Sequence, residues 1–333
     1  MALSRIDGAK RRQLLVALGL FALGAPIGYA QQAGRPWRVG FLGNSSAALE
    51  AGWVDAFREG MRSLGYTEAS LSLEFRWAEG KNERLPDLAA DLARSKVAVI
   101  VTGGTPGTLA GRKSGAGIPI VMVGVGDPVG AGLIGSLSRP GGTVTGIATL
   151  SRELEGKRLE FLSQLSRKPA RVGVLMNPTN PFTPLAMAGM KPAAEALQLT
   201  LVPAEVRSVD DIDSAFRAIR SSNADAVILI ADRFLLANRA KIVASALANS
   251  MPGIFPWAEF AQEGGLMSYG ANYPDMYRRA ANFVDRILKG TKPAEIPVEQ
   301  PTKFELVINQ RTARALSLKI PPSLLARADR VID

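Results

Sequence analysis

The sequence predicts an α/β protein made of two similar parallel-sheet lobes joined by a hinge of three strands. Short apolar runs alternate with segments whose apolar residues recur at helical spacing, which indicates parallel β-α-β units. The layout then occurs twice: RVGFLGN at 38–44 is echoed by RVGVLMN at 171–177, and AVIV at 98–101 is echoed by AVIL at 226–229. Two echoes in the same order favour duplicated α/β lobes over a single sheet.

The first copy begins with a strand at 37–43 and a helix behind it. The apolar residues of that helix, spaced by four and three, are Leu49, Trp53, Phe57, Met61 and Leu64. Further strands are expected at 71–77, 97–101 and 118–123, and further helices at 82–95 and after Gly103. A strand at 143–148 then leads toward the second copy.

The second copy follows the same order of strands and helices, and some residues remain after both copies are complete. Helices are expected at 151–165, after Ser208 and at 274–289, and strands at 171–177, 226–230, 265–270 and 304–308. The residues left over after both copies must return across the interface between the lobes. We therefore expect the chain to cross between the lobes three times. We divide the chain into lobe 1 at 31–148 plus 268–297, and lobe 2 at 149–267 plus 298–333.

Residues 1–30 have the order of a secretory signal peptide. Lys10, Arg11 and Arg12 precede an apolar run at 14–25, and Gly28 and Ala30 offer small residues before a cleavage site. The run is short for a membrane span, which needs about 20 residues; an uncleaved anchor and a twin-arginine signal are the alternatives. With no cysteine for a lipid anchor, we expect a soluble periplasmic protein that is not a lipoprotein.

The composition excludes several classes of function. The 333 residues include no cysteine and no histidine, so disulfides, thiolate or histidine metal sites and Ser-His-Asp catalysis are ruled out. No complete dinucleotide, phosphate-loop or calcium motif occurs, and we expect no enzyme activity, no cofactor and no metal. The net charge is +10 without a run of five basic residues, so we expect no nucleic-acid binding. The pairs 210–211 and 232–233 are interpreted as surface or hinge charges.

Small and polar residues follow the ends of the predicted strands. The segments are 44–46, 102–105, 126–128, 177–180 and 232–233. Ligands of open parallel sheets bind at these ends, where loops and helix N-termini converge. Each residue also has a simpler role as a helix cap, but the set of loops favours a ligand cleft. Trp257 and Tyr269 are suited to stack on a ligand ring, and Trp257 equally to fill the core.

Six stretches carry a family resemblance. They are VTGGTP at 101–106, VGDPVG at 125–130, RPGGTVTG at 139–146, GGLMSYG at 264–270, PTKFELVIN at 301–309 and IPPSLL at 320–325. Together they resemble the ABC-transporter substrate-binding family that includes tryptophan- and phenylalanine-binding members. The resemblance implies a type I periplasmic-binding-protein fold, with the ligand held between the lobes.

The resemblance also places the pocket on the loops described above. The candidate ligand-binding residues are Asn44, Ser45, Ser46, Gly104, Thr105, Asp127, Asn177, Asn180, Asp232, Trp257 and Tyr269. For an aromatic amino acid, an aspartate would take the ammonium group, N–H groups and hydroxyls the carboxylate, and Trp257 or Tyr269 would flank the ring.

We interpret the chain as an exported receptor that captures a small organic solute, such as an amino acid or aromatic compound. As a monomer it would deliver that solute to an ABC permease in the inner membrane after closing about the hinge. The alternative is an exported binding module for a sensor or signalling receptor, and an exported hydrolase or isomerase is a third interpretation. Transport requires a gap between the lobes that the protein's own side chains do not plug.

Overall fold

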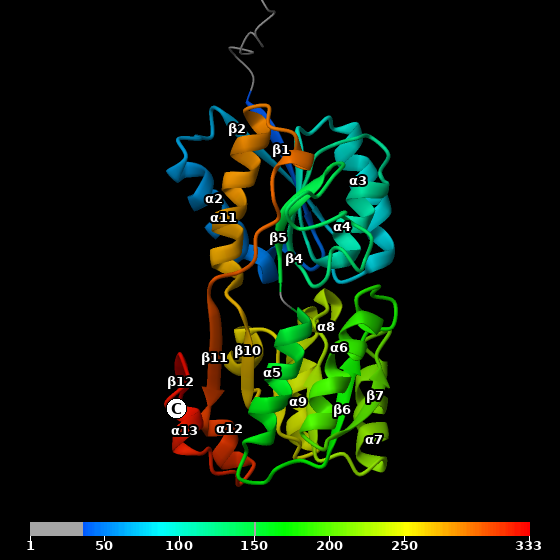
Figure 1. The fold of residues 1–333 in the computed structure, drawn as a ribbon, viewed down its shortest axis with the longest axis vertical. Helices are drawn as coiled ribbons and strands as arrows, with labels where there is room; N and C mark the ends of the chain where they lie inside the picture. Colours follow the sequence, from blue (N-terminus) through cyan, green and yellow to red (C-terminus); the bar gives the residue numbers. More distant parts are fainter. Residues whose placement is uncertain (1–35, 150) are drawn as a thin grey trace, which may run out of the picture. The chain divides into compact units, whose positions relative to one another are not determined.

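The computed structural model describes residues 36–149 and 151–333, so the predicted signal peptide lies outside the described residues. Trp37–Asp333 belong to one structural unit. It contains two sheets, each with helices on both faces (Figure 1). Within the described part of the chain, no helix is both long and apolar enough to cross a membrane.

The first sheet has five parallel strands in the order β2-β1-β3-β4-β5. Their bounds are β1 Trp37–Gly43, β2 Leu71–Trp77, β3 Val99–Gly103, β4 Ile120–Val125 and β5 Val144–Ala148. In the register, Val39 of β1 lies between Leu73 and Val99. β3 is buried along its whole length, as expected of a parallel strand covered by helices on both faces.

The second sheet has seven strands in the order β12-β11-β10-β9-β8-β6-β7. Their bounds are β6 Arg171–Met176, β7 Thr200–Glu205, β8 Ala226–Leu229, β9 Gly253–Phe255, β10 Met267–Ala271, β11 Phe304–Asn309 and β12 Arg330–Ile332. Among these strands the β10–β11 pair alone is antiparallel, with Tyr269 opposite Leu306. The order β7-β6-β8-β9 matches β2-β1-β3-β4 of the first sheet, so the predicted duplication of two parallel-sheet α/β lobes is confirmed.

Helices sandwich the first sheet (Figure 1). On one face lie α2 Ala47–Ser63 and α11 Tyr273–Leu288, and on the other lie η1 Asn82–Arg84, α3 Leu85–Arg94 and α4 Gly104–Lys113. Trp53, Phe57 and Met61 of α2 are buried against this sheet, as their spacing predicted. We call the five-stranded sheet with these helices the first lobe.

The second sheet is covered in the same way. One face carries α5 Ser151–Ser163, α6 Thr183–Ala196, α12 Gln310–Ala315 and α13 Pro322–Leu325; the other carries α7 Asp211–Ser221, α8 Arg233–Ala237, α9 Arg239–Ala248 and α10 Ala258–Gln262. This sheet with its helices is the second lobe. The turn η2 Pro293–Glu295 precedes the last return of the chain.

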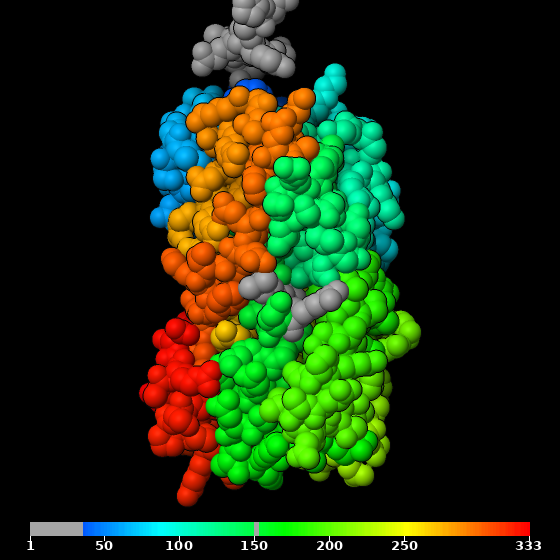
Figure 2. All heavy atoms as spheres, viewed as in Figure 1, coloured from blue at the N-terminus to red at the C-terminus, as the bar shows by residue number. Residues whose placement is uncertain are grey.

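The chain passes between the lobes three times: between β5 and α5, between β10 and α11, and at 296–303. The Ala148 N–H donates to the Glu299 carbonyl and the Glu299 N–H to the Gly146 carbonyl, both at 2.9 Å, so two of the crossings lie side by side. Figure 2 shows the late segments (orange) among the green and blue atoms of the first lobe, and the red C-terminal residues against the second.

One predicted boundary needs correction. Residues 268–271 were assigned to lobe 1, but they belong to β10, which pairs with β9 and β11 of the second sheet. The second crossing therefore falls at Asn272, whose N–H donates to the Lys303 carbonyl at 3.1 Å. The backbone hydrogen bonds of β10 hold it in the second sheet until α11 begins.

Candidate functional site

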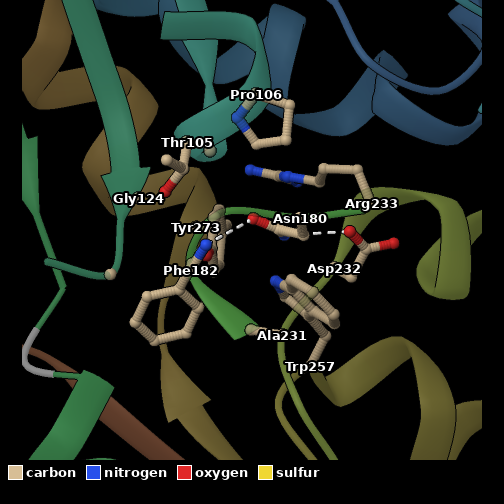
Figure 3. Close-up of a pocket in the computed structure, with 12 residues that line it drawn as sticks. Thr105, Pro106, Gly124, Asn180, Phe182, Ala231, Asp232, Arg233, Trp257 and Tyr273 are labelled. Atoms are coloured by element: carbon tan, nitrogen blue, oxygen red, sulfur yellow. Dashed lines mark hydrogen bonds between the residues drawn. The ribbon is translucent and has the colours of Figure 1, made fainter. Parts of the chain in front are cut away.

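A cavity lies where the carboxyl ends of strands from both sheets meet (Figure 3). Its volume is only about 20 Å³, measured as the space open to the centre of a water molecule, so in this conformation it has room for little more than water. Its lining residues from the first lobe are Gly104, Thr105, Pro106, Gly124, Gly126 and Tyr273, and those from the second are Asn180, Phe182, Ala231, Asp232, Arg233 and Trp257. Both walls follow strand ends, which is where an open parallel sheet binds its ligands.

The first-lobe wall is the start of α4. Its N-cap, Gly103, supplies no side-chain cap, and no acidic residue occupies the first turn. A Cβ on Gly103 would lie 2.8 Å from both Arg233 Nη2 and Tyr277 Oη, so glycine is required for those groups to approach the helix. The helix therefore presents its positive dipole end and backbone N–H groups to the cavity.

The second-lobe wall is organised around Asp232, which is 3% exposed. Its Oδ1 accepts from the Leu235 N–H at 3.1 Å and its Oδ2 accepts from Asn180 Nδ2 at 2.9 Å. Asn180 Oδ1 in turn accepts from the Phe182 N–H at 3.0 Å. Burial raises the pKa of the Asp232 carboxyl above its usual range, and the hydrogen bond from Asn180 opposes that rise.

Arg233 extends across the cavity toward Thr105 and Pro106 (Figure 3). Its Cζ lies 4.3 Å from the ring centre of Trp53, 4.7 Å from that of Tyr273 and 5.7 Å from that of Trp257. Two of these rings belong to the first lobe, so a side chain of the second lobe lies in an aromatic cage built largely by its neighbour. The guanidinium gains cation–π attraction there.

The space between the two cavity walls is smaller than the open gap between lobes that the sequence interpretation required. Arg233 is 5% exposed and fills space between the walls. The earlier interpretation of Asp232 and Arg233 as surface or hinge charges is therefore wrong, because both are buried at the cavity. Entry of a solute requires the lobes to part or the Arg233 side chain to move.

The structure brings five of the predicted ligand-binding residues to the cavity wall: Gly104, Thr105, Asn180, Asp232 and Trp257. Trp257 lines the cavity and packs against Phe260 with ring centres 6.3 Å apart, so it contributes to the core, and its stacking on a ligand ring stays a prediction. Which of the five contacts a ligand stays a prediction.

The other six predicted residues are not among the residues that line this cavity. Ser46 caps α2 by accepting from the Leu49 N–H at 3.4 Å, and Ser45 donates from its N–H and Oγ to Glu50 Oε1 at 2.9 and 2.8 Å. Asn44 is buried, and its Oδ1 lies 2.9 Å from where a Cβ on Gly107 of α4 would stand.

Local hydrogen bonds and ring contacts occupy the remaining three predicted residues. Asn177 Oδ1 accepts from the N–H and Oγ1 of Thr179 at 3.0 and 2.8 Å, and Asp127 Oδ1 accepts from the Gly130 N–H at 2.7 Å. Tyr269 meets Phe161 edge-on, with ring centres 4.9 Å apart. Their strand-end positions serve turns and packing in this conformation.

Sequence reasoning missed Tyr273, Phe182 and Arg233. The rule that strand ends bear the ligand pointed to Arg233, which follows β8 directly after Asp232, but its charge suggested a surface position. Tyr273 begins α11 one residue after the second crossing, so its place at the cavity depended on where that crossing falls.

Comparison with known proteins agrees with this geometry. The family model described as "ABC transporter substrate binding protein" matches residues 46–332. The tyrosine-binding protein of Clostridioides difficile (strain R20291) is 24% identical over 265 residues, which are 79% of this chain and 76% of that protein.

Two solved structures extend the comparison. A conserved domain protein from Vibrio cholerae has a TM-score of 0.83 at 25% identity, covering 89% of this chain and 99% of that one. An ABC domain in complex with L-Trp from Streptococcus pneumoniae has a TM-score of 0.82 at 24% identity, covering 89% and 100%. The predicted two-lobe fold is confirmed by these likenesses, and the chain belongs to the ABC transporter substrate-binding protein family.

Proposed function

We propose that this chain is a periplasmic receptor that binds a small organic solute, an amino acid or an aromatic compound, between its lobes. Members of its family bind a small solute and deliver it to an ABC import permease. Here the receptor acts as a monomer, and the solute leaves the protein chemically unchanged.

The observation that carries the proposal is that the cavity draws its walls from both lobes. A solute bound to one wall is enclosed when the other wall closes over it, and contacts made only in the closed form shift the hinge equilibrium toward closure. A closed, loaded receptor then differs in shape from an empty one, which is the difference that a permease can recognise.

The chemistry of the walls supports the proposed ligand class. Phe182, Tyr273 and Trp257 line the cavity with aromatic rings, and Asp232 and Asn180 offer polar groups beside them. Two relatives are described as binding tyrosine and as a complex with L-Trp. An aromatic amino acid would use both kinds of wall.

Native mass spectrometry of the freshly purified chain, starting at residue 31, tests solute capture, since tightly held ligands stay bound during purification. Thermal unfolding against amino acids, aromatic acids, amines and sugars then identifies the class, because a ligand specific for the folded state raises Tm. A ligand recovered in altered form would favour the hydrolase or isomerase interpretation. A bound mass equal to a second chain would contradict the monomer.

Asp232→Ala and Asp127→Ala form a matched pair for this measurement. Both remove a carboxylate that caps or turns the backbone, but only Asp232 lies at the cavity. We expect ligand-induced stabilisation to fall in Asp232→Ala and to stay unchanged in Asp127→Ala. Equal loss in the two variants would contradict the location of the site.

A further inference from the structure

The buried polar groups of the cavity that lack a partner are mainly hydrogen-bond donors. Nη1 and Nη2 of Arg233 and Nε1 of Trp257 have no hydrogen-bond partner among the described residues, and both side chains line the cavity. Buried polar groups in native proteins are nearly always hydrogen-bonded. A ligand that pairs these donors must therefore bring hydrogen-bond acceptors.

The unmatched donors include a full positive charge. A guanidinium stays protonated in proteins. Within the described part of the chain Arg233 forms no ion pair, and the carboxylates that act on it electrostatically, Glu50 and Glu259, lie beyond ion-pair distance. The oxygens of the neighbouring Asp232 already accept from the Leu235 N–H and from Asn180. The aromatic cage offsets only part of the cost of burying the charge, because cation–π attraction is weaker than the hydration that the guanidinium loses.

The first-lobe wall, opposite Arg233, also favours a negatively charged ligand. The ten-residue helix α4 points its uncapped N-terminus at the cavity, and Gly104, Thr105 and Pro106 of its first turn line it. Helix N-termini stabilise anions through their N–H groups and dipole. An anion in the gap would thus lie between a buried cation on the second lobe and a helix N-terminus on the first.

We propose that Arg233 is the anchor for the carboxylate of the captured solute. The planar guanidinium donates to the two carboxylate oxygens, and the first turn of α4 closes on the same group from the first lobe. This assignment rests on the proposed function and narrows it, because it makes a carboxylate the obligatory part of the ligand. Asp232 needs no ammonium partner, so an aromatic acid without an amino group also binds.

The positive charge of Arg233 also makes closure of the two lobes depend on a bound ligand. When the lobes part, Arg233 leaves the cage of Trp53 and Tyr273 and is hydrated. When they close on an empty gap, it is desolvated with no carboxylate in ion-pair contact. A carboxylate supplies that counter-charge at the moment of closing, so the closed form is favoured mainly when loaded.

Three matched compounds test the anchor by isothermal titration: L-tyrosine, tyramine, which lacks the carboxylate, and 3-(4-hydroxyphenyl)propionate, which lacks the ammonium group. The corresponding set built on L-tryptophan, together with inorganic phosphate, sulfate and a neutral sugar, completes the panel. We expect at least one acid of a set to bind and its amine to bind at least about 30-fold more weakly, the usual effect of unpairing a buried charge.

Variants at two arginines of the second lobe separate the anchor from general charge. Arg233→Gln should weaken binding of the acid at least about 30-fold while leaving the amine unchanged, and Arg233→Lys should retain part of the affinity. Arg239→Gln, which removes a partly exposed ion pair with Glu263, should bind like the parent protein. Urea unfolding of each variant checks that it is folded.

The outcomes distinguish the anchor from the broader function. An amine or a sugar that binds as tightly as the acids, or an Arg233→Gln variant that keeps its affinity for the acid, overturns the anchor and leaves solute capture standing. Phosphate or sulfate binding more tightly than every acid overturns the carboxylate assignment. If nothing in the panel binds and no ligand co-purifies, the proposed function fails with the anchor.

Discussion

Gly126 controls how closely the two lobes approach, and adding one methyl group there should hold them apart. It follows β4 in the first lobe, and the ring of Phe182, at the start of α6 in the second lobe, lies against its Cα. A Cβ on Gly126 would stand closest to Phe182 Cε2 and 2.6 Å from Cζ, where ordinary contact begins at 3.4 Å. In Gly126→Ala the ring must therefore retreat by about 1 Å.

The closed form alone bears this cost. Overpacking of this kind costs about 1–3 kcal/mol, and it disappears when the lobes part. The closed fraction, and with it ligand affinity, should fall by about 5- to 150-fold. Small-angle scattering of the loaded protein measures closure, and isothermal titration measures affinity.

A double variant shows whether the contact itself is responsible. Phe182→Ala removes the ring, so Gly126→Ala made in that background should cost little, and the coupling between the two substitutions should be at least about 1 kcal/mol. If Gly126→Ala closes and binds like the parent protein, or if its effect persists without the ring, the proposed contact between the lobes does not limit closure.

Two further predictions concern stability. Arg158 and Glu155 of α5 form a buried ion pair at 2.8 Å, and burial raises the pKa of Glu155. Arg158→Met should therefore lower the free energy of unfolding, measured in urea, by about 3–5 kcal/mol. The loss should be smaller at low pH, where Glu155 is protonated. Glu155→Leu made together with Arg158→Met should recover most of that loss; equal losses would contradict the ion-pair argument. Burial and a hydrogen bond to Asp285 raise the pKa of Tyr66 to about 12. The stability that this shift contributes is therefore lost between about pH 10 and 12, and Tyr66→Phe should flatten the decline in that window; identical profiles would refute the shift.

The strands were predictable where apolar runs are short and bounded by turn residues. Residues 37–43 and 71–77 agree with β1 and β2 at both ends. No strand was predicted at β7, because Pro203 interrupts its apolar pattern. Proline is tolerated in β7 because this strand lies at the edge of its sheet. The local sequence pattern thus identified uninterrupted strands, but it could not show that an edge strand would tolerate a proline.

The candidate site was only half predictable, for a tertiary reason. Strand ends pointed correctly to Gly104, Thr105 and Asp232, because the topology alone brings those positions together. The burial of Arg233 depends on rings supplied by Trp53 and Tyr273, which are distant in sequence and belong to the other lobe. No local pattern distinguishes such an arginine from a solvated one.

The position of α11 affects how this protein must be made. It covers a face of the first sheet, yet its residues, 273–288, are synthesised long after β5 ends at residue 148. Until they emerge from the ribosome, the apolar side chains of β1, β3 and β4 that α11 will cover stay exposed. A nascent chain therefore cannot complete the packing of its N-terminal half until almost all of it has been translated.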